Sequence, residues 1–515
     1  MTREMLYDAI TDVKDELVTE AMETRPAKNR VHWLKFGSIA AAVALVVGLG
    51  AGVMNGTIRL PLGGNEAGSG HDESSIFMAY AGPVFPLTTV EGGGGLTAQR
   101  AITYDFQDWM LHSYWGLSTT DAYTLTNPTG EDKEVTLLYP FVTTLYRLDR
   151  YSPALTLDGV KLDTELLTGQ YSRIGSGRSG GLPSMSQTES WTGYQTLLSD
   201  GRYQSGALEE WPDLSHIPVT VYEVTDPWVA EDAGGTNPTI HTAFGLDYDK
   251  TVVLSYGFNG GCYDRDTGTM RQSFSVPRPS EGGTYMDYGF YERDLAESHY
   301  LIVVGEPVSD FQLFGTYDGD PASTDYMEWD RSIRADMRQY ETDLESALRT
   351  VAEQLHGKRW ANASGVADDE YRPDFELYFG MMKDCLLETG VLLGDADGRL
   401  DDLSFESNNR VFYLKAQVTV PAGGSVTVEA QMLKEPSYDF CCTGTKNQGV
   451  YGYDLVTRLG TRLDFTAQTA KAVNTDGVEI VRQNFGFDWA NGADTVTLDP
   501  AEEHYYLEVR RSTEK

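Results

Sequence analysis

The length, composition and charge of the chain narrow the classes of protein to which it can belong. With 515 residues, 41% of them hydrophobic, it is long enough for two or three folded units and too apolar to be largely disordered. Its net charge of −37 repels phosphate backbones, and no basic cluster lies beyond residue 35, so we expect no nucleic-acid partner. The chain has four cysteines: Cys262, Cys385, Cys441 and Cys442. They lack the spacing of a zinc site, and they are too few for disulfide bonds to hold a fold of this size together.

The first predicted element is a short amphipathic helix over residues 5–22. Its apolar residues recur at helical intervals: Leu6, Ile10, Val13 and Leu17. An isolated helix of this length is marginally stable in water, so its apolar stripe predicts a cytoplasmic protein partner that docks there. The alternative is a helix that merely lies beside a membrane.

A transmembrane helix is predicted over residues 33–54. Residues 36–54 contain no charged side chain, and at ~1.5 Å per residue they cross the ~30 Å hydrocarbon core of a lipid bilayer. A cleaved signal peptide is the main alternative, but more than 30 residues precede this stretch and no clear A-x-A site follows it. The segment is also apolar on all sides, which disfavours a helix in a protein core.

The charges on either side of the segment predict its orientation. Arg25, Lys28, Arg30 and Lys35 lie on its N-terminal side, whereas the other side offers only Arg59. By the positive-inside rule, residues 1–32 are cytoplasmic and the large C-terminal part is extracellular. Residues 55–75 are rich in Gly, Ser and Asn and predict a flexible stalk.

A β-rich extracellular domain with sandwich-like antiparallel sheets is predicted over residues 76–330. Residues 122–126 and 135–141 are β-branched and aromatic, and they flank the polar turn NPTGEDK, which is typical of antiparallel strands. Further runs of this kind lie at residues 218–224, 251–258 and 300–304.

The remainder predicts a helical insertion over residues 331–394 and a C-terminal β domain over residues 395–515. Apolar residues recur every three or four positions from Ile333 to Leu355, and a second helix is expected from Pro373 to Leu393. Strands are then expected at residues 412–420, 425–431, 495–498 and 504–509. The fold class is therefore mainly β, with one helical insertion, preceded by one transmembrane helix.

A weak calcium-binding pattern follows the second predicted helix. Asp395, Asp397 and Asp401 are spaced as in the middle of an EF-hand loop, with Gly398 at its turn. Leu393 and Ser404 stand where two strong ligands belong, so an Asp/Gly turn is the preferred interpretation. A second acidic loop, with Asp318, Asp320 and Asp325, is given the same interpretation, because clusters arise by chance among 77 acidic residues.

No catalytic constellation is recognisable in the sequence. Residues 177–181 match G-x-S-x-G, but Ser/Gly-rich loop precedes them and Pro183 follows, whereas a nucleophile elbow needs a strand and a helix. Exposed aromatic residues could stack on glycans, although core packing explains most of the tryptophans. A surface hydrolase that acts on glycans therefore remains an alternative, with no acid or nucleophile that the sequence identifies.

Two parts of the chain resemble known groups of proteins. The opening layout, LYDAITDVKDELVTEA followed by a basic patch and one apolar stretch, is similar to that of membrane-anchored proteins of Firmicutes. These include anti-sigma-factor-like proteins, whose cytoplasmic helix holds a sigma factor. Later phrases, AYTLTNPTGEDKEVTLLYPF, YGFNGG and VTVPAGGSVTVEA, resemble uncharacterised surface proteins of Firmicutes. The resemblance implies an architecture and a possible signalling partner, and no activity.

Together these patterns predict a single-pass membrane protein whose extracellular part binds or senses a ligand, with no enzymatic activity and no cofactor. The expected partners are the lipid bilayer at residues 33–54, a cytoplasmic protein at residues 5–22, and an extracellular ligand or glycan. The alternatives are an anti-sigma-like signalling protein and the surface hydrolase.

Overall fold

The computed structural model describes twelve stretches of the chain: residues 81–90, 95–111, 115–171, 211–234, 237–258, 260–276, 298–320, 323–361, 372–388, 398–403, 405–439 and 447–512. Their contacts divide these residues into two compact units, which are described separately. Unit 1 comprises the described residues from Trp211 to Phe405. Unit 2 combines the described residues 81–171 with residues 406–512. Both units are built mainly of antiparallel β-sheets, as the sequence predicts.

Unit 1 contains two sheets. The larger has the order β15-β8-β13-β10-β16 and the smaller has the order β11-β12-β9-β14. The strands of the larger sheet are β15 (Ile333–Asp343), β8 (Pro218–Val229), β13 (Ser298–Gly305), β10 (Thr251–Tyr256) and β16 (Gly398–Arg399). Those of the smaller are β11 (Gly260–Asp264), β12 (Thr269–Ser275), β9 (Thr239–Gly245) and β14 (Ser309–Thr316).

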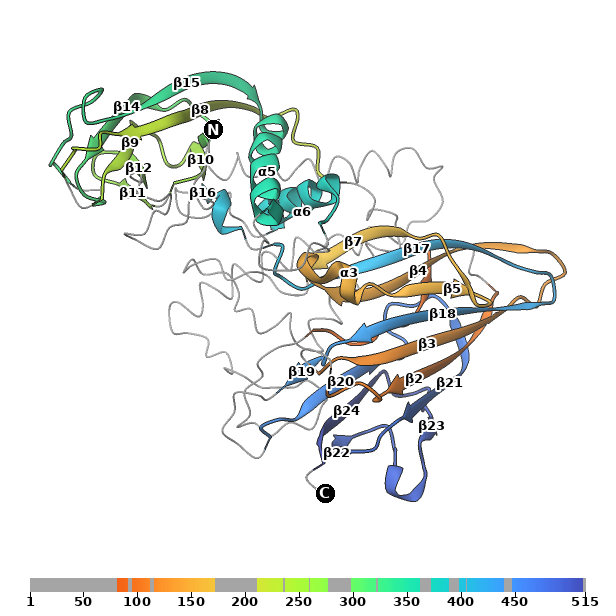
Figure 1. The fold of residues 1–515 in the computed structure, drawn as a ribbon. Helices are drawn as coiled ribbons and strands as arrows, with labels where there is room; N and C mark the ends of the chain where they lie inside the picture. The colour runs from red at the N-terminus through yellow and green to blue at the C-terminus, as the bar shows by residue number, and fades with distance from the viewer. Residues whose placement is uncertain are drawn as a thin grey trace, which may run out of the picture. The chain divides into compact units, whose positions relative to one another are not determined.

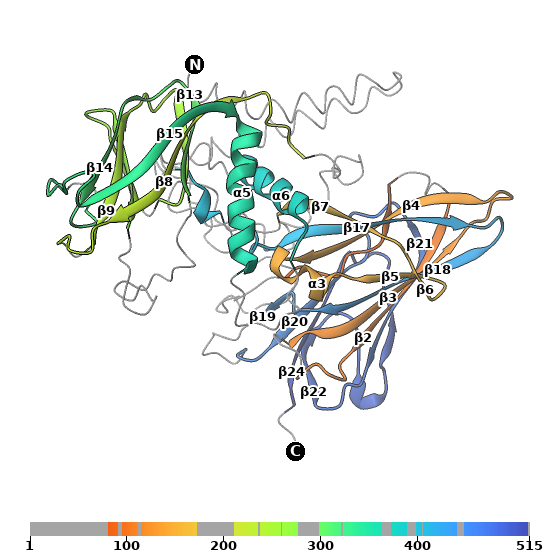
Figure 2. The same ribbon diagram turned by 45° about the horizontal axis from the view of Figure 1, so that its top comes forward.

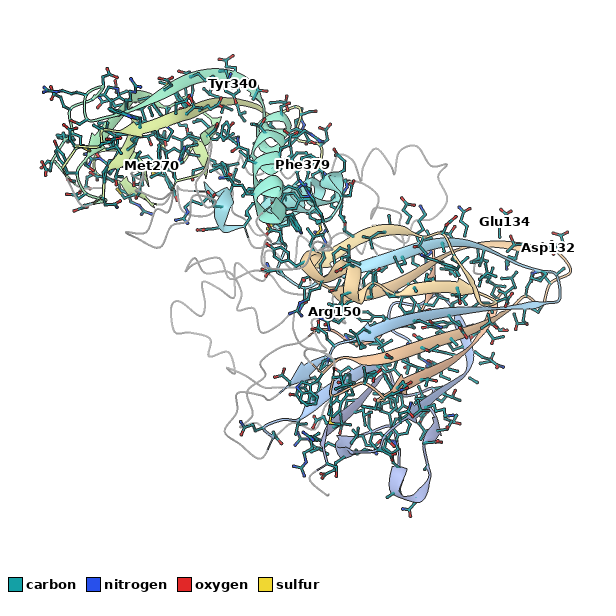
Figure 3. All side chains as sticks on the ribbon, in the orientation of Figure 1. Asp132, Glu134, Arg150, Met270, Tyr340 and Phe379 are labelled. Atoms are coloured by element: carbon teal, nitrogen blue, oxygen red, sulfur yellow. The ribbon has the colours of Figure 1, made fainter. Side chains whose placement is uncertain are left out.

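The two sheets of unit 1 face each other across an apolar core, with residues of both in one buried cluster. Tyr222 of β8 stacks on Phe311 of β14 with ring centroids 4.2 Å apart. Met270 of β12, labelled in Figure 3, is buried in the same cluster. Because alternate residues of each strand point inward, the interior side chains of the two sheets interdigitate as in a β-sandwich.

Two helices accompany the larger sheet of unit 1. They are α5 (Leu344–Ala361) and α6 (Phe375–Glu388), and both views show α5 directly after β15 (Figures 1 and 2). Leu348, Val351 and Ala352 of α5 are fully buried. The Nε2 of Gln354 donates to the hydroxyl of Tyr300 on β13 at 3.1 Å, so α5 covers the sheet face opposite the sandwich core.

The helix predicted from Ile333 begins only at Leu344, since Ile333–Asp343 forms strand β15. Ile333, Met337 and Tyr340 have helical spacing, but they do not share one buried face: Ile333 is buried, whereas Met337 is 43% exposed. The segment pairs with β8 along its length, apart from one bulge. Long-range pairing with residues 218–229 therefore overrides the local periodicity.

Unit 2 contains three sheets. A seven-stranded sheet has the order β23-β21-β2-β3-β18-β5-β6, and two four-stranded sheets have the orders β1-β4-β17-β7 and β19-β20-β24-β22. The seven strands are β23 (Thr495–Thr497), β21 (Asp464–Val473), β2 (Thr97–Asp105), β3 (Leu117–Thr126), β18 (Ser425–Lys434), β5 (Ala154–Leu157) and β6 (Val160–Lys161). The others are β1 (Thr88–Thr89), β4 (Lys133–Thr143), β17 (Arg410–Val420), β7 (Glu165–Tyr171), β19 (Tyr438–Asp439), β20 (Tyr451–Val456), β24 (His504–Arg511) and β22 (Val478–Gln483).

One segment joins the two four-stranded sheets into a single layer. Thr88 and Thr89 pair with β4, and Val84 forms a parallel bridge with Leu455 of β20. The combined layer packs on the seven-stranded sheet through an aromatic-rich cluster that includes Tyr104, Tyr453 and Leu507. Unit 2 is thus also a two-layered β-sandwich.

Two arches carry the chain between the layers of unit 2. Residues 127–132 connect β3 to β4, but β3 pairs with β18 and β4 pairs with β17. Residues 421–424 connect β17 to β18 in the same manner. The backbone N–H of Asn127 donates to the carbonyl of Gly424 at 3.0 Å, so the arches are bonded to each other. The strands predicted on either side of NPTGEDK are present, but they lie in opposite layers rather than in one hairpin.

The division of the chain differs from the predicted succession of domains at residues 76–330, 331–394 and 395–515. Strands of residues 81–171 pair with strands that begin only at Arg410, so in the sequence unit 1 is inserted between the two halves of unit 2. The cause is the pairing of β2 with β21, β3 with β18 and β4 with β17, which local sequence does not encode.

No helix within the stretches given above is long and apolar enough to cross a membrane. The predicted cytoplasmic helix, the transmembrane segment at residues 33–54 and the stalk lie outside the described residues.

Candidate functional site

A surface hollow in unit 2 contains the most strongly perturbed amine among the described residues. Its wall is largely apolar and is formed by Ala81, residues 83–84, residues 140–142 and residues 432–433. Three polar side chains complete it: Tyr151, Lys434 and Glu435. Its volume of about 10 Å³ is roughly what one water molecule needs. We call this feature the Lys434 hollow.

Lys434 is the last residue of β18 and is only 7% exposed. Its ammonium donates to the carbonyl of the next residue, Glu435, at 2.6 Å. Burial lowers the pKa of Lys434 to about 8, although the negative charges of Glu435 and Asp454 act in the opposite direction. A substantial part of this amine is therefore neutral near physiological pH, unlike that of an exposed lysine.

The segment after β4 supplies Tyr151 to the hollow and Arg147 as the ion-pair partner of Glu435. Arg147 ends a short 3₁₀-helix, Leu145–Arg147, and Tyr151 ends α3 (Leu148–Tyr151). Arg147 Nη1 pairs with Glu435 Oε1 at 2.7 Å. Burial, together with the charge of Glu435, raises the pKa of Tyr151 to about 12, so its phenol stays protonated. The hollow thus combines a partly neutral amine with a phenol that remains a proton donor.

A second polar cluster lies on β19, β20, β22 and β24. The carboxylate of Glu508, fully buried, accepts hydrogen bonds from Tyr438 Oη at 3.0 Å and from Arg482 Nε. Burial raises the pKa of Glu508, and the guanidinium of Arg482 opposes this. Gly452 lies under the Tyr438 ring, where an added Cβ would come within 2.1 Å of a ring carbon. On the same strands, His504 Nε2 lies 3.2 Å from Asp454 Oδ1.

A third cluster spans the two layers of unit 2. The guanidinium of Arg100 on β2 forms two hydrogen bonds, of 2.8 and 2.7 Å, with the carboxylate of Asp121 on β3, and neither side chain is exposed. Arg100 also donates to the carbonyl of Val456 on β20 at 2.6 Å. Asp121 accepts further hydrogen bonds from Tyr123 at 2.6 Å and from Tyr139 at 3.1 Å. This network is satisfied by residues of the protein, which is the arrangement of a structural core.

Unit 1 has a row of directly opposed polar residues under α5. Arg338 of β15, Glu223 of β8 and Tyr300 of β13 are neighbours in register. Glu223 accepts from Arg338 Nε and from the hydroxyl of Tyr300, the latter at 3.1 Å. Glu223 is buried, whereas the Arg338 side chain is 70% exposed. These hydrogen bonds connect the three strands to one another, and the bond from Gln354 to Tyr300 connects them to α5.

Two buried histidines of unit 1, His299 and His241, are packed as neutral core residues. His299 stacks on Phe274 with ring centroids 3.6 Å apart, and burial lowers its pKa to about 3. His241 Nε2 lies 2.9 Å from the hydroxyl of Thr316, and burial lowers its pKa to about 4. Neither carries a charge at neutral pH.

Of the predicted calcium ligands, the structure describes only Asp401. Its Oδ2 accepts the backbone N–H of Gly257 at 2.8 Å, so this carboxylate fixes the chain at the end of β10. Asp395 and Asp397 lie outside the described residues. In the acidic loop, Asp318 accepts from Asp320 N and Ser323 Oγ, which is a local turn contact. Within the described stretches, no group of three or more His, Cys, Asp or Glu residues is arranged to hold a metal ion.

The remaining predicted site residues are placed as follows. Leu6, Ile10, Val13 and Leu17, and the G-x-S-x-G match at residues 177–181, lie outside the described residues. Among the tryptophans, Trp109 is buried and donates to Tyr453 Oη at 2.5 Å, whereas Trp228 is 41% exposed under the guanidinium of Arg334.

The sequence analysis did not predict the Lys434 hollow or the second polar cluster, which contains Asp454 and Glu508. The only signal for them is the placement of charged residues, namely Lys434, Asp454 and Glu508, within runs that otherwise predict buried strands. Comparison of the chain with protein-family models and with curated proteins finds no match.

Proposed function

We propose that the chain is a single-pass membrane-anchored protein that displays two β-sandwich units outside the cell, where they bind or sense a ligand without catalysing a reaction. The observation that carries this proposal is the uncharged stretch of residues 36–54, with basic residues on its N-terminal side and the acidic β units beyond it. The basic flank gives the orientation.

Three buried carboxylates among the described residues belong to structural hydrogen-bond networks. The buried carboxylates of Asp121, Glu223 and Glu508 are all engaged by neighbouring donors, which is typical of structural networks.

The membrane anchor is tested by fractionation of cells that express the full chain or a variant that lacks residues 36–54. The full chain should sediment with membranes and resist extraction by carbonate at high pH, and the deletion variant should not. A variant with Val43→Ala and Val46→Ala is the matched control, because it keeps the stretch apolar and should behave as the full chain. Recovery of the full chain in the soluble fraction would contradict the proposal.

Signalling across the membrane is the second candidate function, because Leu6, Ile10, Val13 and Leu17 form an apolar stripe on the cytoplasmic side. This stripe would dock a cytoplasmic protein such as a sigma factor. Crosslinking and affinity capture of the full chain in cells should recover one partner that Leu6→Asp and Ile10→Asp both abolish. Thr11→Asp, off the stripe, is the control. Equal recovery with all variants would exclude docking through the stripe.

A further inference from the structure

We propose that Lys434 is a covalent modification site at which formaldehyde, the smallest neutral carbonyl compound, forms an imine with the lysine amine. The inference is independent of where the chain resides and goes beyond ligand binding. It rests on the position of the amine, the chemistry of the hollow wall and the charges around it.

Lys434 is one of the residues that line the hollow. It is 7% exposed, and its largely apolar neighbours in the wall are Ala81, residues 83–84, residues 140–142 and residues 432–433. Its ammonium has three donor positions, and one is used by the carbonyl of Glu435 at 2.6 Å. A hollow with room for about one water molecule excludes all but the smallest electrophiles, which favours formaldehyde, with two heavy atoms, over longer aldehydes.

The charges around the hollow favour a neutral electrophile over an anionic one. Glu435 and Asp454 are the carboxylates that act on Lys434, while Arg147 is paired with Glu435 at 2.7 Å. An anionic reagent would approach these carboxylates unfavourably, whereas an uncharged carbonyl compound would not. The product imine, when protonated, carries the same positive charge as the lysine that it replaces.

Formation of the imine needs no reagent other than the lysine amine and the aldehyde. The neutral Nζ of Lys434 attacks the carbonyl carbon to give a carbinolamine, and a proton moves from nitrogen to oxygen. Loss of one water molecule then gives the carbon–nitrogen double bond. No oxidant or reductant takes part. The lowered pKa of Lys434 supports the first step, since a lysine with a pKa of about 8 is about 300 times more often neutral at pH 7 than one with a pKa of 10.5.

The test treats the full-length protein in detergent with limiting formaldehyde and sodium cyanoborohydride at pH 7, which reduces each imine to a stable methylamine. Peptide mass spectrometry then measures the rate of methylation at each lysine. Lys434 should be modified at least about tenfold faster than the exposed Lys161 on β6. Faster modification of Lys161, or modification of Lys434 only after denaturation, would overturn the proposal.

Two variants test whether the reagent reaches the amine of Lys434 through the hollow. Val142→Phe, which fills the hollow from β4, should slow the methylation of Lys434 at least about tenfold and leave Lys161 unchanged, because the larger side chain blocks access. Lys161→Arg is the matched control and should not alter the rate at Lys434. If Val142→Phe is folded, as judged by its circular dichroism and melting curve, and Lys434 reacts at the original rate, the hollow is not the route and the proposal fails. If that variant does not fold, Ala81→Leu applies the same test from another lining residue.

Discussion

At the scale of single residues, unit 2 depends on charges that are buried and paired. Arg100 and Asp121 lie between the layers with no exposed surface, and each also bonds to groups on other strands. Removing one partner would leave the other charge buried without compensation, which costs more than the pair itself contributes. The pair therefore fixes how the layers fit together.

The first prediction concerns this pair. Asp121→Asn should lower the free energy of unfolding of unit 2 by about 3–5 kcal/mol, because Arg100 keeps its charge in the core without a counterion. Urea denaturation followed by hydrogen–deuterium exchange of β2 and β3 measures the change. The control is Arg331→Gln, which breaks an ion pair with Glu328 between largely exposed side chains and should cost under about 1 kcal/mol. Equal effects of the two substitutions would show that burial of the pair is not decisive.

The second prediction concerns the pH dependence caused by Lys434. Its pKa is about 8 in the folded protein and about 10.5 when unfolded, so between these values the unfolded chain binds more protons. Stability due to this residue should therefore rise with pH from about 8 to about 10.5, and charging the amine costs up to about 3 kcal/mol below that window. Lys434→Met should therefore have the larger free energy of unfolding at pH 7. The gain is reduced by the loss of the hydrogen bond from Lys434 to the carbonyl of Glu435.

Urea denaturation of both proteins from pH 7 to pH 10.5 checks this dependence. The advantage of Lys434→Met should shrink as the pH rises, because the wild-type amine loses its proton in both states. Other titrating groups cancel in the comparison. A difference that stays constant with pH would contradict the lowered pKa.

At the scale of elements, the arches of unit 2 depend on one buried amide. The Nδ2 of Asn127 donates to the carbonyls of Glu131 and Val420 at 2.8 and 3.1 Å, and its Oδ1 accepts from Thr129. Asp132, labelled in Figure 3, accepts the N–H of Ala422 at 2.9 Å. The side chains of the first arch thus satisfy backbone groups of the second.

The third prediction follows from this arrangement. Asn127→Ala should destabilise unit 2 by about 2–4 kcal/mol, because it removes several hydrogen bonds and leaves the buried Val420 carbonyl without this donor. Hydrogen exchange should accelerate at the adjoining ends of β3 and β17. Thr126→Ala, which removes only a hydroxyl contact with Ser425, is the control and should change stability by under about 1 kcal/mol. Unchanged exchange in Asn127→Ala would show that the arches do not depend on it.

Sequence patterns predicted the individual strands better than they predicted which strands pair with each other. The runs rich in β-branched residues at 218–224, 412–420 and 425–431 all lie within strands. A strand that is buried on one or both faces favours such residues, so its own sequence is enough to predict it. The predicted helix was wrong over Ile333–Asp343, because pairing with β8 overrides the helical spacing of this segment, and it was confirmed from Leu344 onward. The Lys434 hollow could not be predicted, because residues 83, 140, 151 and 434 meet only through the pairing of distant strands.

At the scale of the whole molecule, the proposed function places two β-sandwich units beyond a membrane anchor. Unit 1 is inserted between the halves of unit 2, so both ends of unit 1 connect to strands of a single sandwich. The acidic charge of the chain suits an exposed, soluble surface that avoids anionic lipid headgroups. The side of the membrane on which these units lie is the central claim.

Cys262 provides the most direct test of this claim, because it is an exposed free thiol on β11, whereas Cys385 is buried. In a Cys441→Ser, Cys442→Ser background, a membrane-impermeant maleimide should label Cys262 on intact cells, and Cys262→Ser should abolish the signal. Thr2→Cys, added to the Cys262→Ser protein, should react only after permeabilisation, since the N-terminus is predicted to be cytoplasmic. Labelling of Cys262 only after lysis, or of Thr2→Cys on intact cells, would contradict the proposed topology.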